Sequence, residues 1–282
     1  MRLIVSEVKI MRDNCKISKN AIIKKDVIIG NNVVIEDNVY IDYGAIIYDN
    51  VHIKSGTTIG ARCILGEHLM DFYENHTDKM HPLIIGKNSL IRSETIIYGD
   101  TIIGDYFQSG HRVTIREKTY IGNHVSIGTI SDIQGNCRIG NYVRMHSNVH
   151  IGQCSVIDDY VWIFPYVVLT NDPTPPSEIL EGVHVHSFAI IATAAIVMPG
   201  IEVGQDSLIG AGAIVTKNVD KYVVILGNPG KSVSDVRKIK NKVTGEPVYP
   251  WRNYFNRAMP WEHIGFKQWY DSLDITNKIK IE

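Results

Sequence analysis

A ladder of mostly aliphatic residues at six-residue spacing constrains the fold of this chain more than any other feature. The ladder runs from Ile17 to Leu65, from Ile85 to Leu169 and from Ile191 to Val215. Two residues before nearly every rung stands a second small or β-branched residue, so the two face one side of a strand while the residue between them faces the other. A helix of 3.6 residues per turn cannot keep this repeat on one face. The pattern therefore predicts short strands joined by corners.

The corners carry a longer repeat. They are rich in Gly, Asn and Asp, which tolerate positive φ or cap a turn locally. The turns that begin at Gly86, Gly104, Gly122, Gly140 and Asp158 recur every 18 residues. Three flat strands per coil give this period, and residues 18 apart then stack at about 4.8 Å. We predict an all-β solenoid of about ten coils around one narrow core.

Two segments interrupt the ladder, at residues 66–82 and 170–187, and by the 18-residue count both leave from the same corner. Long irregular loops in a compact repeat are usually functional, so we expect them to border a cleft. We assign residues 1–225 to the solenoid domain and residues 226–282 to a C-terminal helical, aromatic tail. Helices are expected at residues 232–242 and 260–273, and we expect the tail to dock on the end of its own solenoid or on a neighbour.

Composition excludes several classes of protein. The 282 residues carry a net charge of −1, which offers no basic excess for nucleic acid. The N-terminus is too short and too polar for a signal peptide or a membrane span, so we expect a cytoplasmic protein without nucleic-acid or membrane partners. Three of the four cysteines, Cys15, Cys63 and Cys137, fall in the inward column, where a thiol acts as a small hydrophobe. No metal is expected.

The hexads of residues 11–220 and the segment VVILGNPGK that follows them resemble the hexapeptide-repeat acyltransferases. The resemblance implies a left-handed parallel β-helix; the general preference for right-handed crossovers would give the opposite hand. It also implies that acyl-coenzyme A is the co-substrate and that the active unit is a homotrimer, with a groove between subunits.

The segments FQSGHRVTIRE, HSNVHIGQ and TNDPTPPSE are most similar to nucleotide-amino-sugar N-acyltransferases of surface-glycan pathways, such as the anthrose-pathway enzyme. This similarity implies that the chain moves an acyl group from acyl-CoA to the amine of a nucleotide-linked amino-deoxy sugar, with dTDP as the expected nucleotide.

One corner departs from ordinary turn chemistry, because histidine, arginine and carboxylate side chains stack there. His111 occupies a position similar to that of the family's catalytic histidine and is our first candidate for the base. On the adjoining face Asp132 is predicted to lie one coil below His150, which gives a second candidate, a histidine oriented by a carboxylate. In some relatives the sulfur of the departing CoA accepts the proton instead.

Further residues are candidates for binding. Substrate contacts are expected from Arg92, Glu94, Arg112, Arg116, His146, Asn148 and, in the first loop, Tyr73. The family resemblance places CoA along the later coils, near Ala194, Ala195, Gly210, Ala213, Lys217 and Lys231.

Two other classes of protein share this fold. The first is the γ-class carbonic anhydrase, which binds zinc through three histidines. His111, His146 and His150 are the available set, although the spacing from His146 to His150 is one residue short of the family pattern. The second is a non-catalytic scaffold.

Overall fold

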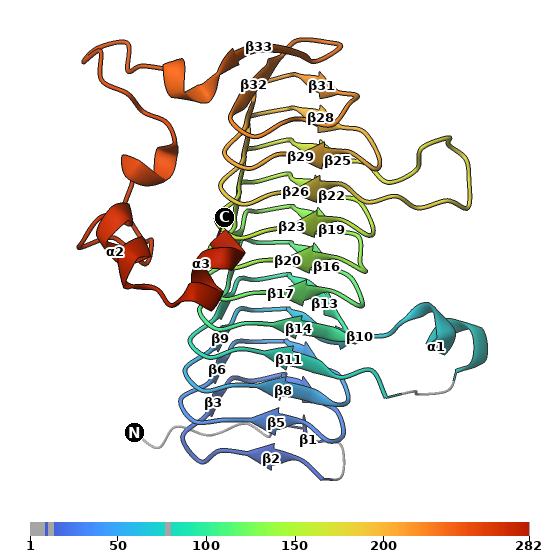
Figure 1. The fold of residues 1–282 in the computed structure, drawn as a ribbon. Coiled ribbons are helices and arrows are strands. Elements are labelled where there is room, and N and C mark those ends of the chain that lie inside the picture. The colour runs from blue at the N-terminus through green and yellow to red at the C-terminus, as the bar shows by residue number, and fades with distance from the viewer. Residues whose placement is uncertain (1–8, 11–13, 77–79, 282) are drawn as a thin grey trace.

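The structure, a computed structural model, describes residues 9–10, 14–76 and 80–281. These residues form a parallel β-solenoid whose three sheets, of 11, 10 and 12 strands, are the sides of a triangular prism (Figure 1). The predicted all-β solenoid is therefore confirmed, with about 11 turns in place of the expected ten. The arrangement agrees with the left-handed parallel β-helix that the family resemblance implies.

We name the faces sheet A, sheet B and sheet C in the order in which the chain enters them. Sheet A contains β1 (Lys9–Ile10), β4 (Ile28–Ile29), β7 (Ile46–Ile47), β10 (Ile64–Glu67), β13 (Ile96–Tyr98), β16 (Thr114–Ile115), β19 (Asp132–Ile133), β22 (His150–Ile151), β25 (Val168–Leu169), β28 (Ile196–Val197) and β31 (Ile214–Val215). Sheet B contains β2 (Lys16–Ile17), β5 (Val34–Ile35), β8 (Val51–Ile53), β11 (Leu83–Ile85), β14 (Thr101–Ile103), β17 (Tyr120–Ile121), β20 (Arg138–Ile139), β23 (Val156–Ile157), β26 (His184–Val185) and β29 (Glu202–Val203). Sheet C contains β3 (Ile22–Ile23), β6 (Tyr40–Ile41), β9 (Thr58–Ile59), β12 (Leu90–Ile91), β15 (Gln108–Ser109), β18 (Ser126–Ile127), β21 (Arg144–Met145), β24 (Trp162–Ile163), β27 (Ile190–Ile191), β30 (Leu208–Ile209), β32 (Val223–Leu226) and β33 (Lys231–Asp235).

The register within each sheet follows the 18-residue arithmetic. In sheet A, Thr114 pairs with Asp132, and Asp132 pairs with His150. The corners stack as well, since the N–H of Ile130 donates to the carbonyl of His111 at 2.9 Å. Residue numbers alone therefore placed these positions correctly one above another.

The rungs form one continuous core along the axis, where residues such as Ile29 and Ile97 are fully buried. At one turn the large and small residues exchange places, so that Phe107 fills a slot that is small elsewhere and Ser109 stands on the rung. The Ser109 hydroxyl accepts the N–H of Arg92 at 2.9 Å, so this buried polar group is satisfied. The exchange keeps the core filled.

The corner between sheets B and C shows why Asn and Asp recur in the turns. The Asn123 Oδ1 atom accepts the N–H of Asp105 at 2.8 Å, and the Asn141 Oδ1 atom accepts the N–H of Asn123 at 2.9 Å. Beside this ladder a column of rings stacks with centroids 4.6 to 5.3 Å apart: Tyr106, His124, Tyr142, Tyr160 and Phe188.

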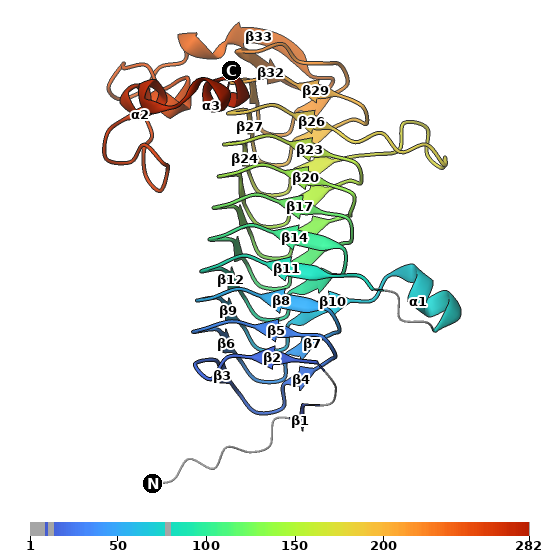
Figure 2. The same cartoon turned by 60° about the horizontal axis from the view of Figure 1, so that its bottom comes forward.

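The two interruptions leave from the corner between sheets A and B, as predicted. The first follows β10 and contains α1 (Met70–Asn75), and the second follows β25. Both extend from the same side of the prism, five turns apart (Figures 1 and 2). The cavity described below lies on sheet C, however, so within one chain the two loops are not its walls.

The C-terminal tail differs from the prediction in its first part. Residues 231–235 form β33, which pairs antiparallel with β32, and only a 3₁₀ turn, η1 (Val236–Lys238), follows. The helix expected at residues 232–242 is therefore wrong, because the backbone there continues the ladder of sheet C. The tail then forms η2 (Trp251–Asn253), α2 (Phe266–Ser272) and α3 (Ile275–Ile281), of which α2 confirms the second predicted helix.

The aromatic residues of the tail pack on the side of the solenoid. Trp251 and Trp261 are buried in a cluster with Tyr160 and Phe188, which belong to the corner between sheets B and C. Only the hairpin of β32 and β33 lies at the end of the prism, while the rest of the tail runs back beside the turns (Figures 1 and 2). None of the described helices has the length and apolar character that crossing a membrane requires.

Candidate active site

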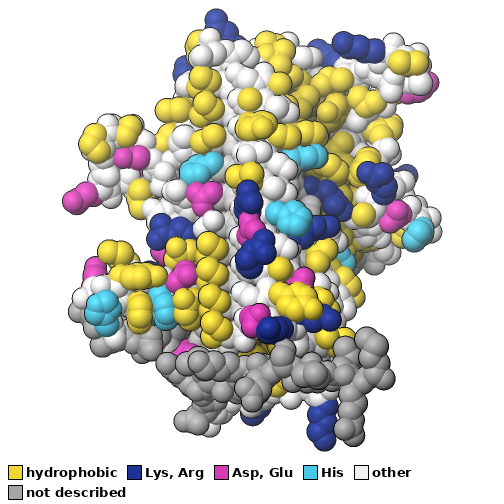
Figure 3. All heavy atoms as spheres, turned by 180° about the vertical axis from the view of Figure 1, so that it is seen from behind, with side chains coloured by type: hydrophobic (Ala, Val, Ile, Leu, Met, Phe, Trp, Pro, Cys, Tyr) yellow, Lys and Arg dark blue, Asp and Glu magenta, His cyan; other side chains and the backbone are white. Residues whose placement is uncertain are grey.

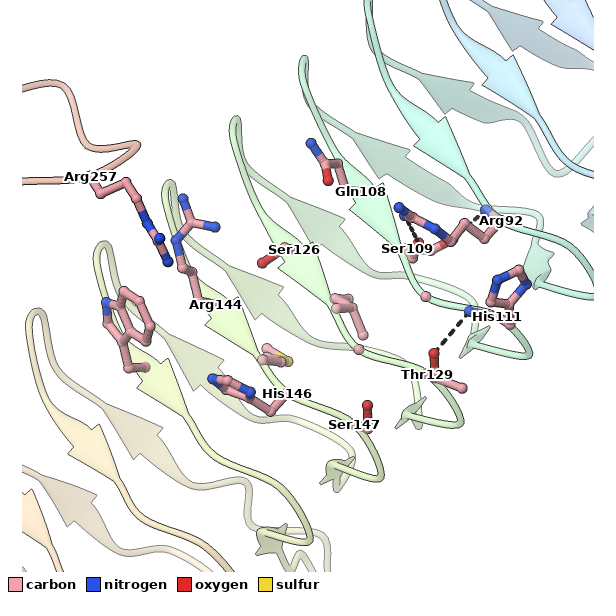
Figure 4. Close-up of a pocket in the computed structure, with 15 residues that line it drawn as sticks. Arg92, Gln108, Ser109, His111, Ser126, Thr129, Arg144, His146, Ser147 and Arg257 are labelled. Carbon is pink, nitrogen blue, oxygen red and sulfur yellow. Dashed lines mark hydrogen bonds between the residues drawn. The ribbon is translucent and has the colours of Figure 1, made fainter. Parts of the chain in front are cut away.

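A cavity of about 450 Å³ lies on the outer face of sheet C, next to the corner that leads into sheet A (Figure 4). Its volume is within the range of small-molecule sites. Figure 3 shows the side of the molecule that carries this edge, where basic and histidine side chains gather. The cavity is lined by Arg92, Gln108, Ser109, Gly110, His111, Ser126, Ile127, Gly128, Thr129, Arg144, Met145, His146, Ser147, Trp162 and Arg257.

Two glycines form the floor of the cavity at successive corners. A Cβ atom on Gly110 would lie 2.2 Å from the backbone nitrogen of Thr129, and one on Gly128 would lie 2.3 Å from the carbonyl carbon of His146. No side chain fits at these distances, so the turns can stack closely only with glycine here. The close stacking brings the His111 and His146 corners into one cavity.

His111 stands where β15 turns toward sheet A, and its imidazole is exposed to the cavity (Figure 4). Its backbone N–H donates to the Thr129 hydroxyl at 3.3 Å. Ser147, two turns further along, lines the same cavity. The vertical relation that the repeat predicted between His111 and Ser147 is confirmed.

His146 also lines the cavity, two turns beyond the His111 corner. Its ring stacks on Phe164 with centroids 4.7 Å apart. Burial, followed by the positive charge of Arg144, lowers the pKa of His146. The imidazole is therefore held neutral at physiological pH, the state in which a ring nitrogen accepts a proton.

Two arginines face each other at the far end of the cavity. Arg144 projects from β21, and Arg257 reaches in from the C-terminal tail (Figure 4). Burial and the charge of Arg257 lower the pKa of Arg144, whose Nε atom is buried without a hydrogen-bond partner. Among the described residues that line the cavity, none is Asp or Glu. A buried, unpaired donor is costly, so this end of the cavity is suited to an anion.

Arg92 lines the opposite end. Its Nη1 group donates to the carbonyl of Ser109 at 3.2 Å, which fixes the guanidinium beside the exchanged rung. With Arg144 and Arg257 it makes three cationic side chains around one space.

Glu94 and Arg112 stack at the same corner, as predicted, but neither lines the cavity. The Arg112 Nε group donates to Glu94 at 2.6 Å, and Arg62 binds the other carboxylate oxygen. The hydrogen bonds from Arg62 and Arg112 lower the pKa of Glu94 to about 2. Glu94 is thus fully engaged by two arginines, and its carboxylate is not free to bind a ligand.

The pair of Asp132 and His150 forms as predicted, with 3.3 Å between the Asp132 Oδ2 and His150 Nδ1 atoms. The hydrogen bond from His150 lowers the pKa of Asp132. Both side chains lie on sheet A, around the corner from the cavity, and Asn148 lies at the corner between the two faces. None of the three lines the cavity.

Two other predicted substrate contacts lie elsewhere on the chain. Arg116 pairs with its neighbour Glu117 at 2.9 Å and covers the ring of Tyr98. Tyr73 lies in α1, where its hydroxyl bonds to Glu67 at 3.2 Å. Within one chain the structure does not bring either residue to the cavity.

The residues predicted to bind CoA follow the edge that carries His111. Ala194 and Gly210 stand at the later corners between sheets C and A. Ala195 and Ala213 are fully buried in the core, so within one chain neither offers a surface to a ligand. Two lysines complete the set near the end of the prism, and both are exposed: Lys217 and Lys231.

One column of the cavity and one residue of the tail were not predicted from the sequence. Gln108, Ser126, Arg144 and Trp162 form the outward column of sheet C, 18 residues apart, and the same arithmetic that stacked the corners would have found them. Arg257 carried no such signal, because the tail has no repeat.

The zinc set of the carbonic-anhydrase alternative is not assembled within the described chain. His146 faces the cavity on sheet C, whereas His150 projects from sheet A toward Asp132. Among the described residues, the one group that could bring three ligand atoms together lies on sheet B and includes none of these histidines.

Residues 9–42 match the family model for the bacterial transferase hexapeptide, six repeats, and residues 192–217 match the hexapeptide repeat of succinyl-transferase. The chain is a hexapeptide-repeat protein. Both matched segments lie in the solenoid, where the structure shows one short strand per hexad.

Curated relatives of this hexapeptide-repeat protein are acyltransferases with different acceptors. It is 31% identical over 117 residues to galactoside O-acetyltransferase of Escherichia coli, covering 34% of this chain and 58% of the relative. It is 32% identical over 95 residues to a chloramphenicol acetyltransferase of Klebsiella aerogenes, covering 32% and 42%. It is 26% identical over 178 residues to the acyl-(acyl-carrier-protein)–UDP-N-acetylglucosamine O-acyltransferase of Stutzerimonas stutzeri, covering 62% and 65%. In each case the match spans less than two thirds of the relative.

Solved structures with similar folds include a UDP-N-acetylglucosamine acyltransferase of Francisella novicida, at 20% identity and a TM-score of 0.40, covering 80% of this chain and 68% of that one. A mutant of perosamine N-acetyltransferase from Caulobacter crescentus, in complex with CoA and GDP-perosamine, matches at 22% identity and a TM-score of 0.25, covering 50% and 57%. Similarity at this level does not bear on the substrate of the hexapeptide-repeat protein.

Proposed function

We propose that this chain is an acyltransferase that moves an acyl group from acyl-CoA to the amine of a nucleotide-linked amino-deoxy sugar, with dTDP as the first nucleotide to test. The observation that carries the proposal is the cavity on sheet C, in which two histidines stand between arginines and no described lining residue is a carboxylate. A base and a site for an anion are the two things this reaction requires of the protein.

Acyl transfer is supported by the relatives. Their acceptors differ, from a galactoside to chloramphenicol to UDP-N-acetylglucosamine, while the transfer of an acyl group is common to all three. Function follows the site rather than the fold, so the identity of the acceptor must come from the cavity itself.

The arginines support an acceptor that carries phosphate. Arg144 and Arg257 repel each other across the cavity, and Arg144 retains an unpaired buried donor. A diphosphate placed between them would pair both guanidinium groups, each of which presents a planar fork to phosphate oxygens. The indole of Trp162, under the Arg144 guanidinium at 5.7 Å, offers an apolar surface beside that position.

In the proposed reaction the amine nitrogen attacks the thioester carbonyl, a C–N bond forms and the C–S bond breaks. The amine must lose a proton as it attacks, and in the proposed reaction His111 takes it. The departing CoA sulfur leaves as a thiolate, which takes the proton from the His111 imidazolium and becomes the thiol. His146, which is held neutral, lies two turns from His111 and would accept a hydrogen bond from the sugar.

The donor would lie along the edge between sheets C and A. Ala194 and Gly210 keep this edge free of large side chains, which allows a pantetheine arm to approach the backbone. We propose that a neighbouring subunit of a homotrimer closes the cavity from the open side, as closed threefold symmetry would permit. Analytical ultracentrifugation tests this part directly.

The proposed reaction is tested with acetyl-CoA and amino sugars linked to dTDP, UDP or GDP, by following release of the CoA thiol. A thermal-shift panel of the free nucleotides and short acyl-CoAs precedes it, because a ligand at 100 times its dissociation constant adds about 2.7 kcal/mol to the folded state. Failure of every acyl-CoA to shift the melting temperature or release thiol would contradict the proposal.

Replacing Arg144 or Arg257 by alanine is expected to raise KM for the nucleotide sugar roughly 10-fold to 100-fold, because a hydrogen bond to a charged group contributes about 1.5–3 kcal/mol. Arg138→Ala is the matched control, since Arg138 is a surface arginine on sheet B outside the cavity. Steady-state kinetics at saturating acetyl-CoA give the result. An equal rise in KM for Arg138→Ala would show a general charge effect rather than a phosphate site.

Asp132→Asn and His150→Asn are both expected to leave kcat near the wild-type value, because the pair lies on sheet A outside the cavity. The hydrogen bond that lowers the pKa of Asp132 is then structural. Large and equal losses in the two variants would instead establish His150, oriented by Asp132, as the base.

A further inference from the structure

A cluster of possible metal ligands lies on the outer face of sheet B, away from the cavity. His184 in β26 and His186 are two residues apart, so their side chains project from the same side of the strand. The His184 Nε2 atom lies 3.0 Å and the His186 Nδ1 atom 3.3 Å from the Oδ2 atom of Asp158. Two imidazoles and one carboxylate therefore converge on one point.

The sequence departs from its own repeat at this point. Asp158 occupies the corner position that is glycine in the four preceding turns, at Gly86, Gly104, Gly122 and Gly140. One turn later, at the end of β26, the same column carries His186. The turn itself does not need these side chains, since glycine serves it elsewhere.

The distances fit a tetrahedral zinc site. Zinc binds imidazole nitrogen at about 2.0–2.1 Å and carboxylate oxygen at about 2.0–2.2 Å. Tetrahedral geometry then separates two ligand atoms by roughly 3.3 Å. The ligand atoms of Asp158, His184 and His186 all lie within 4.8 Å of one another, and two of the separations are 3.0 and 3.3 Å.

The other ring nitrogen of His186 has an acidic neighbour. The His186 Nε2 atom lies 3.6 Å from Oε2 of Glu202, in the next strand of sheet B. A histidine that binds a metal through one nitrogen commonly donates its other N–H to a carboxylate, which fixes the ring. Glu202 stands in that position.

A different histidine of the chain shows what an ordinary ion-pair network looks like. His81 contacts Asp100 through Nδ1 at 2.8 Å and Asp71 through Nε2 at 3.1 Å. Its two carboxylates bind different ring nitrogens and therefore lie on different sides of the ring. Only the cluster on sheet B, among the residues described, brings three ligand atoms from three side chains together.

We propose that Asp158, His184 and His186 bind one divalent transition-metal ion, with Zn²⁺ as the metal to test and water in the fourth position. Two imidazoles favour zinc over magnesium or calcium, which prefer oxygen ligands. Asp158 precedes the second loop, whereas His184 and His186 lie at its C-terminal end. The ion would therefore tie the two ends of this loop segment together. It would fix the loop from the outside of sheet B and take no part in the cavity on sheet C.

The test is a zinc titration of tag-free, full-length protein stripped with a chelator, read with a chromophoric zinc indicator. One ion per chain is expected. His184→Ala and His186→Ala should each weaken binding at least about 100-fold, and Glu202→Gln should weaken it about 10-fold to 100-fold, as is typical of outer partners. His52→Ala is the matched control, because His52 lies on the same face of sheet B and pairs with a single carboxylate, Glu36.

Absence of stoichiometric zinc binding overturns the proposal, and so does binding that survives His184→Ala and His186→Ala or falls equally in His52→Ala. Asp158→Gly provides a variant whose turn is expected to fold, since glycine occupies this position in five other turns. Loss of zinc binding in Asp158→Gly, with an unchanged circular dichroism spectrum, supports a metal site rather than a general loss of structure.

Discussion

Replacing His111 with asparagine is expected to lower kcat by about 100-fold or more, because a positioned general base contributes about 10²- to 10⁴-fold. The side chain is exposed to the cavity at a corner, and the contact that holds this residue is made by its backbone N–H to Thr129. Asparagine preserves that backbone bond. The variant should therefore lose activity without losing stability.

The kinetic pattern distinguishes a base from a binding residue. Loss of a group that acts only in the transition state lowers kcat and kcat/KM together, whereas loss of uniform binding raises KM alone. We expect the first pattern for His111→Asn and the second for Arg144→Ala. His146→Asn is the paired variant, since His146 lines the same cavity two turns away.

The pH dependence of kcat/KM gives an independent readout. An imidazole acts as a base only when it is unprotonated, so the rate is expected to fall at low pH, and His111→Asn should remove this fall. If the variant turns over at nearly the wild-type rate, His111 is not the base, and the CoA sulfur or His146 takes its place. A large loss of kcat/KM that occurs only in His146→Asn would identify His146 as the base that takes the proton.

Most of the fold could be predicted from the sequence because, in a regular repeat, the number of residues between two positions fixes where they lie relative to each other. Side chains alternate along each strand and turns repeat every 18 residues, so the pairing of Asp132 with His150 followed from counting. The same counting placed His111 and Ser147 on one edge. It would also have found Arg144 and Trp162, had the outward column of sheet C been followed in the same way.

Spatial neighbours cannot be predicted from residue numbers in segments that lack the repeat. The 170–187 loop has no periodic pattern, so the alignment of Asp158 with His186 across it was not predicted, and the proposed metal ligands on sheet B were missed. Arg257 enters the cavity from a tail whose docking depends on the packing of aromatic rings. That packing is decided by three-dimensional shape, for which the spacing of residues in the tail gives no rule.

The docked tail also contains a buried ion pair, and we expect its loss to cause the largest single destabilisation. Arg252 Nη1 binds Oδ2 of Asp206, whose side chain is 0% exposed while that of Arg252 is 14% exposed. The guanidinium also lies 4.4 Å from the ring centroid of Phe188 and 5.1 Å from that of Phe266. Removing one partner of a buried pair leaves an uncompensated charge, which costs about 3–5 kcal/mol. Arg252→Ala is expected to destabilise the docked tail by this amount.

The effect should depend on pH with a definite sign. Burial raises the pKa of Asp206 to about 6 although Arg252 opposes the shift, and loss of Arg252 raises that pKa further. A carboxyl whose folded pKa is raised above its unfolded value contributes stability that is present at low pH and lost as pH rises through the folded pKa. Arg252→Ala should therefore cost more at pH 8 than at pH 5.

The four tryptophans of the chain report on this equilibrium, because Trp162, Trp251, Trp261 and Trp269 all belong to the cluster between tail and solenoid. Urea titrations followed by their fluorescence at pH 5 and pH 8 measure the loss. Arg252→Met combined with Asp206→Leu is the control, since apolar replacement of both partners removes the unpaired charge and often restores stability. Because the same tail carries Arg257, the single variant should also raise KM for the nucleotide sugar, and the double variant should restore it. Equal losses in the single and double variants would mean that packing of the aromatic rings, rather than the ion pair, holds the tail in place.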